Sequence, residues 1–106
     1  SHLTQSFNTL VECPDFLSED DIHLWDNALA PGYGQLGPIA KKAVQLMAHK
    51  EGHILDPVYT AKSFATIPEM LNDNSIAKGS RVLFVHTGGA AGLFAYQSDM
   101  QKIFAD

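Results

Sequence analysis

The alternation of apolar and polar positions predicts short strands separated by helices. Three runs have the length and the β-branched or aromatic content of strands: 22–25, 53–55 and 82–85. Helical periodicity and helix start signals predict helices at about 3–11, 38–51, 58–71 and 90–96, the last extending to about residue 104. Pro38 suits the first turn of a helix, and Gly52 suits the residue that ends one.

This order of elements predicts an α/β fold. Strands that alternate with helices form a parallel sheet covered by those helices, so we expect three layers, with a mostly parallel sheet and helices on both faces. Three strands make a very small sheet, and parallel sheets are normally buried on both faces. We therefore expect the chain to be a partial piece of a larger fold, or to form an oligomer.

Composition and charge narrow the classes of function. The 106 residues carry a net charge of −5 and no basic cluster, so we expect no nucleic-acid partner. No apolar run approaches the length of a membrane span, so we expect no membrane partner. The single cysteine, Cys13, excludes an intramolecular disulfide and is compatible with the cytoplasm, the localisation that we expect.

The motif His86-Thr87-Gly88-Gly89 follows the predicted strand at 82–85 and is the strongest candidate for a binding site. Glycines let the backbone approach a ligand closely, and a threonine hydroxyl beside a helix N-terminus offers hydrogen-bond donors. This combination suits an anion or a polar cofactor. Many α/β proteins use the same turn for steric reasons alone, so both interpretations stay open.

Two further loops, at 32–34 and 56–62, are expected at the same edge of the sheet as this motif, because the carboxyl ends of parallel strands meet there. Together they bring hydroxyl groups that suit a flat, polar ligand, from Tyr33, Tyr59, Thr60 and Thr87. A phenol becomes a strong acid, base or nucleophile only if its pKa is shifted, and Lys62, one helical turn from Tyr59, is a candidate cation for this.

Structural roles remain open for the same residues. Tyr59 also suits a packing position, Lys62 a solvated surface position, and His86 a hydrogen-bonded position in the core. Asp56, before Pro57, suits a turn or a helix cap. The histidines lack metal-ligand spacing, so we expect no metal site.

Taken together, these loops resemble the C-terminal part of the 1-aminocyclopropane-1-carboxylate deaminase / D-cysteine desulfhydrase family. The matching segments are 31–34, 52–62, 82–89 and 93–96, and the resemblance covers about residues 20–96. The family comprises fold-type-II, pyridoxal-phosphate-dependent enzymes related to the tryptophan synthase β subunit. The resemblance implies that residues 1–106 are a C-terminal fragment of such an enzyme. The partners it implies are the rest of the enzyme chain and, at full length, a second copy in a homodimer.

The resemblance also implies roles for individual residues. Tyr59 would be a catalytic proton-transfer group or nucleophile, and Tyr33 would hold the substrate on the same face. Four residues would contact the pyridoxal phosphate: Thr87, Gly88, Gly89 and Thr60. The Schiff-base lysine and the phosphate-binding loop of the family have no counterpart in this chain, so we expect the isolated chain to be inactive.

Thr60 occupies the position where the deaminases of this family carry a glutamate directed at the pyridine nitrogen. A neutral hydroxyl keeps that nitrogen protonated less well than a carboxylate does, which makes the ring a weaker electron sink. We therefore expect β-elimination from a cysteine-like amino acid, giving pyruvate, ammonia and sulfide. The alternatives are a 1-aminocyclopropane-1-carboxylate deaminase and a cysteate sulfo-lyase.

Two non-catalytic functions stay open beside this one. The chain is also compatible with a module that binds a protein partner through an unpaired sheet edge. It is equally compatible with a small phosphate-binding module that uses Thr87, Gly88 and Gly89 at a helix N-terminus.

Overall fold

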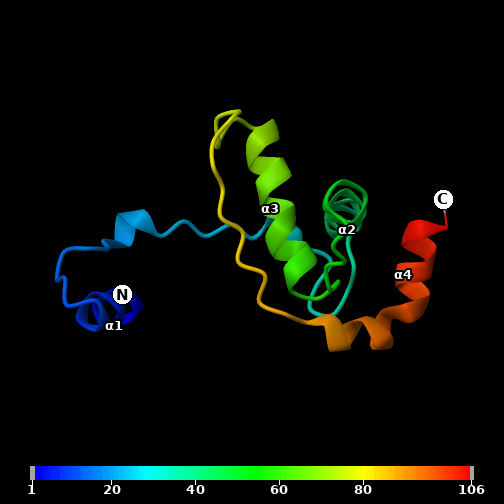
Figure 1. The fold of residues 1–106 in the computed structure, drawn as a ribbon, viewed down its shortest axis with the longest axis horizontal. Coiled ribbons are helices and arrows are strands. Elements are labelled where there is room, and N and C mark those ends of the chain that lie inside the picture. The colour runs from blue at the N-terminus through cyan, green and yellow to red at the C-terminus, as the bar shows by residue number, and fades with distance from the viewer. Residues whose placement is uncertain (1, 106) are drawn as a thin grey trace.

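The computed structural model describes residues 2–105 as helices joined by turns and extended segments (Figure 1). Elements labelled α are α-helices and those labelled η are 3₁₀ helices. In chain order they are α1 (His2–Leu10), η1 (Glu19–Asp21), η2 (Asn27–Leu29), α2 (Pro38–Glu51), α3 (Thr60–Asn72), η3 (Ala90–Tyr96) and α4 (Gln97–Phe104).

The predicted α/β fold is wrong, because residues 2–105 contain no strand and therefore no parallel sheet with helices on both faces. The segments 22–25, 53–55 and 82–85 are irregular and join no ladder of backbone hydrogen bonds. An apolar, β-branched run forms a strand only where a neighbouring strand accepts and donates its hydrogen bonds. Leu24 and Leu83 are 94% and 89% exposed, so the runs 22–25 and 82–85 are not buried as sheet strands would be, whereas Leu55 of the run 53–55 is buried in the core.

The core lies where α2 packs against α3, with α4 on the other side of α2 (Figure 1). Its buried apolar residues are Ala40, Val44, Met47, Leu55, Ala61 and Ile103. A second cluster joins α2 and α3 to the segment around η2 through Ala28, Ala43 and Ala65, with Trp25 packed against it. The core therefore fixes the start of α3 relative to the segment that precedes α2.

The predicted ends of α2 are confirmed. Pro38 begins the helix, and Gly52 ends it in a left-handed conformation (φ +69°), with its N–H donating to the Ala48 carbonyl at 3.1 Å. The helix buries Ala40, Ala43, Val44 and Met47, whereas Leu46 is 39% exposed. Residues 90–96 are helical as predicted, but as a 3₁₀ helix rather than an α-helix.

The N-terminal helix α1 lies apart from α2, α3 and α4 (Figure 1). It is joined to the loop that follows it by the Asn8 side chain, which donates to the Pro14 and Leu17 carbonyls and accepts from the Leu17 N–H. None of the helices in residues 2–105 has the length and apolar character needed to cross a bilayer.

Candidate functional site

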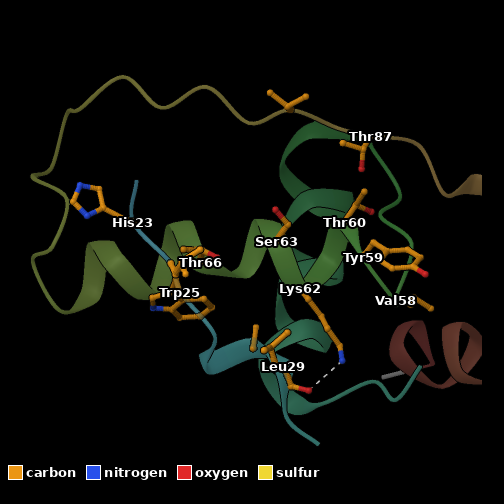
Figure 2. Close-up of a pocket in the computed structure, with 13 residues that line it drawn as sticks. His23, Trp25, Leu29, Val58, Tyr59, Thr60, Lys62, Ser63, Thr66 and Thr87 are labelled. Carbon is orange, nitrogen blue, oxygen red and sulfur yellow. Dashed lines mark hydrogen bonds between the residues drawn. The ribbon is translucent and has the colours of Figure 1, made fainter. Parts of the chain in front are cut away.

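Three segments that are distant in sequence meet around the N-terminus of α3, where they border a cavity of about 540 Å³ (Figure 2). The cavity is lined by aromatic and apolar side chains from the segment around η2, and by polar and apolar side chains from the turn into α3, from α3 itself and from the segment after it. These include Trp25, Tyr59, Thr60, Lys62, Ser63 and Thr87. Two of the three predicted loops, 56–62 and 86–89, contribute to this lining, whereas the loop 32–34 does not, and helix packing rather than a sheet brings the segments together.

Asp56 organises the turn that leads into α3. Its carboxylate accepts hydrogen bonds from the N–H groups of Val58, Tyr59 and Thr60 at 2.8–2.9 Å, and from the Thr60 hydroxyl at 2.5 Å. Burial opposes its ionisation, but these hydrogen bonds outweigh burial and place the pKa of Asp56 below its ordinary value. Asp56 is therefore an ionised cap whose acceptor sites are filled by its own turn.

Tyr33 and Tyr59 form a direct hydroxyl pair. Their oxygens are 2.6 Å apart, and the rings meet edge to face with centroids 6.1 Å apart. The hydrogen bond between the two hydroxyls is the main cause that raises the pKa of Tyr59 above its ordinary value, followed by electrostatic repulsion from Tyr33 and smaller effects of burial, Asp56 and Tyr96. Tyr59 therefore keeps its proton at neutral pH.

The sequence suggested Lys62 as a cation that lowers the pKa of Tyr59. In the structure, Lys62 is not among the groups that shift this pKa. Its Nζ instead donates to the Gly32 carbonyl at 2.7 Å and makes a longer contact of 3.4 Å with the Leu29 carbonyl (Figure 2). The side chain is 8% exposed, so the interpretation as a solvated surface lysine is also wrong.

The motif at 86–89 reaches the site through Thr87 and Gly89. Thr87 lines the cavity with Thr60, whereas His86 is exposed and accepts from the Gly88 N–H at 3.2 Å, so it is not a core histidine. Gly89 packs directly on the Asp56 carboxylate: a Cβ built on it would lie 2.5 Å from Oδ2. Gly88 has φ +102° and open space around its Cβ position.

Tyr96 is a residue of this region that sequence reasoning missed. Its hydroxyl donates to the Gly34 carbonyl at 2.8 Å, next to Tyr33. The contact spans 62 residues along the chain, so local pattern carries no signal for it. Tyr96 lies in a segment that the family resemblance includes, and that was the one sign of its importance.

The paired phenols of Tyr33 and Tyr59 lie beside a cavity that Thr60 and Thr87 help to line, and phenol hydroxyls can donate or accept a proton. No protein-family model matches the chain. D-cysteine desulfhydrases of Salmonella typhi, Salmonella newport (strain SL254) and Salmonella heidelberg (strain SL476) are each 47% identical to it over 76 residues. That match covers 72% of this chain and 23% of each relative.

The chain therefore belongs to the D-cysteine desulfhydrase family, which confirms the resemblance found in its motifs. It spans about a quarter of the length of these curated relatives.

Proposed function

We propose that this chain forms the proton-transfer side of a pyridoxal-phosphate-dependent active site that eliminates sulfide from D-cysteine. The observation that carries the proposal is the Tyr33–Tyr59 hydroxyl pair, set at the N-terminus of α3 beside the cavity that Thr60 and Thr87 line. The overall reaction converts D-cysteine and water into pyruvate, ammonia and hydrogen sulfide.

The hydroxyls around the cavity fit the pyridine ring of pyridoxal phosphate. The carboxylate nearest to them, Asp56, already accepts four hydrogen bonds from its own turn. The Thr60 hydroxyl donates its single hydrogen to Asp56, so Thr87, whose side chain also lines the cavity, would be the threonine that donates to a ring nitrogen. When bound, the cofactor would supply the electron sink for breaking the bonds at the substrate's α-carbon.

A neutral partner for the ring nitrogen favours β-elimination. A free carboxylate would hold that nitrogen protonated and strengthen the sink, whereas a hydroxyl does so weakly. Loss of sulfide from a β-carbon needs a weaker sink than opening a cyclopropane ring does. Together with the names of the relatives, this favours D-cysteine over 1-aminocyclopropane-1-carboxylate as the substrate.

Tyr59 would act as the general acid. Its raised pKa keeps the hydroxyl protonated at neutral pH, which suits donation to the departing sulfur and argues against a phenolate nucleophile. Tyr33 would hold the Tyr59 hydroxyl in line and replace the proton that Tyr59 gives up. Tyr33 is 81% exposed and Tyr59 is 58% exposed, so both hydroxyls are open to a ligand.

The test is the release of pyruvate from D-cysteine by the complete polypeptide with pyridoxal phosphate. Tyr59→Phe is expected to lower kcat by roughly 100-fold, because it removes the proton donor. Cysteate and 1-aminocyclopropane-1-carboxylate, assayed in parallel, decide the substrate.

Tyr96→Phe is the matched comparison, because it also removes one phenol hydroxyl. The Tyr96 hydroxyl donates to the Gly34 backbone carbonyl and not to Tyr59. We expect Tyr96→Phe to retain more activity than Tyr59→Phe does. Full activity in Tyr59→Phe would contradict the role of the tyrosine pair.

A further inference from the structure

The side chains of Lys62 and Tyr96 donate hydrogen bonds to the backbone on either side of Tyr33. The Lys62 Nζ donates to the carbonyl of Gly32, the residue before Tyr33, at 2.7 Å. The Tyr96 hydroxyl donates to the carbonyl of Gly34, the residue after it, at 2.8 Å. The two donors come from different elements, α3 and η3, so they fix the loop from two directions.

Beside these two contacts, the backbone of the Tyr33 loop has a longer hydrogen bond of 3.3 Å, from the Gln35 N–H to the same Gly32 carbonyl. The Tyr33 side chain is 81% exposed, and its ring packs edge to face on Tyr59. Gly32 has φ +149° and Gly34 has φ +68°, so the backbone on both sides of Tyr33 takes conformations that glycine adopts without constraint. One hydrogen bond between exposed hydroxyls does not offset the entropy of ordering such a loop.

Lys62 is built into the structure in a way that suits this task. Lysine is rarely buried without a partner, and this side chain is 8% exposed. Two carbonyl groups, from Leu29 and Gly32, accept from its Nζ, and no carboxylate in residues 2–105 forms an ion pair with it. Tyr59 and Lys62 lie three residues apart at the start of α3. One short segment therefore carries both Tyr59, the proposed proton donor, and Lys62, which holds the loop of its partner Tyr33.

We propose that Lys62 is a positioning residue that sets the Tyr33 hydroxyl on the Tyr59 hydroxyl by holding the Gly32 carbonyl. The proposal rests on the proposed function for its effect on activity, but its effect on the Tyr33–Tyr59 pair stands independently. A lysine that only stabilises the fold would change the stability of the protein without changing the ionisation of Tyr59.

The test measures the ionisation of Tyr59 and the activity of the same variants in the complete polypeptide. Tyrosine labelled with ¹³C at the ring carbon that bears the hydroxyl reports the pKa of Tyr59 by NMR, with the signal assigned through Tyr59→Phe. The groups that act on this hydroxyl are Tyr33, Asp56 and Tyr96, and all three are kept.

Lys62→Met removes the donor and keeps most of the side-chain volume. We expect the pKa of Tyr59 to fall toward its ordinary value and kcat on D-cysteine to fall on the order of tenfold, as a displaced catalytic group produces. Lys62→Arg, which can still donate to the carbonyls, is expected to restore part of both. Lys41→Met removes the same charge from an exposed position on α2 and is expected to change neither.

An unchanged Tyr59 pKa in Lys62→Met would overturn the proposal, whether or not the activity falls. Circular dichroism of the variant shows whether it folds, and Lys62→Arg tests the positioning role should Lys62→Met not fold. If Tyr59→Phe keeps full activity, the proposed function fails, yet the NMR comparison of the Lys62 variants still decides whether Lys62 positions the pair.

Discussion

The Asp56 carboxylate is the residue on which the local geometry of the site depends. It is 3% exposed, and its oxygens accept hydrogen bonds from three consecutive N–H groups, those of Val58 and Tyr59 in the preceding turn and of Thr60, the first residue of α3. Thr60 adds a fourth hydrogen bond through its hydroxyl. The hydrogen bonds to this one carboxylate therefore fix a turn in which the Tyr59 side chain is exposed and the Thr60 side chain is buried.

Asp56→Asn is expected to destabilise the protein by about 1–2 kcal/mol at neutral pH, because the amide nitrogen cannot accept a hydrogen bond from Thr60. The pKa of Asp56 lies below its unfolded value near 3.8, so its contribution is present above that pH and is lost as the pH falls through the folded pKa. Urea unfolding at neutral pH and at about pH 3 measures this difference.

The gap in unfolding free energy between parent and variant should be widest at neutral pH and should narrow in acid. A gap that is the same at both pH values would show that the charge of Asp56 is not what the turn requires.

At the residue scale, sequence alone predicts contacts between residues that are close in sequence and misses contacts between residues that are far apart in sequence. Asp56 is predictable as a turn or cap residue, because its partners lie two to four residues away. The Lys62–Gly32 and Tyr96–Gly34 contacts span 30 and 62 residues and depend on how α3 and η3 pack. The pairing of Tyr33 with Tyr59 followed from the expected meeting of loops, but their direct hydroxyl contact did not.

At the scale of elements, the helices were predictable and the strands were not. Pro38 and Gly52 mark the ends of α2 by their own backbone preferences, which need no partner. A strand needs a second segment to complete its hydrogen bonds, and within residues 2–105 none is placed beside 82–85. Phe84 alone of that run turns inward, where its ring meets Phe64 edge to face at 5.4 Å.

The segment 86–89 depends on Gly89, and Gly88 beside it offers a matched control. Both have positive φ, so an alanine at either position costs about 1–2 kcal/mol through the backbone. At Gly89 the new Cβ would also strike the Asp56 carboxylate, which four hydrogen bonds hold in place, at a further cost of about 1–3 kcal/mol. Urea unfolding of Gly88→Ala and Gly89→Ala compares the two.

Gly89→Ala should be clearly the less stable variant. Equal losses in the two variants would mean that the segment 86–89 does not rest on the Asp56 turn.

At the scale of the whole molecule, the chain is extended and exposes much apolar surface. Its accessible area is 7973 Å², whereas a compact protein of this mass exposes about 5,800 Å². Its radius of gyration is 16.1 Å, against about 13 Å for a compact chain of this length. The surplus comes from α1 and from the irregular segments, since the packed elements are η2, α2, α3, η3 and α4. Composition alone did not reveal this, because an apolar fraction does not say where the apolar residues will lie.

Two leucines test where stability resides. Leu55 is fully buried in the core and Leu83 is 89% exposed, so Leu55→Ala is expected to cost about 2–5 kcal/mol and Leu83→Ala less than about 0.5 kcal/mol. Thermal or urea unfolding of the two variants measures both values. A large loss for Leu83→Ala would show that another surface covers this leucine in the folded protein.

The exposed, extended segment 81–87 is a candidate site for cleavage by a protease. A protease binds its substrate as an extended strand, and this segment is already extended, with no backbone hydrogen bond to the rest of the described chain. Arg81, the one arginine of the sequence, lies at its start, whereas Lys62 is shielded within α3. Cleavage by a trypsin-like enzyme after Arg81 would separate Thr87 and Tyr96 from Tyr33 and Tyr59, so a single cut would divide the site into two peptides.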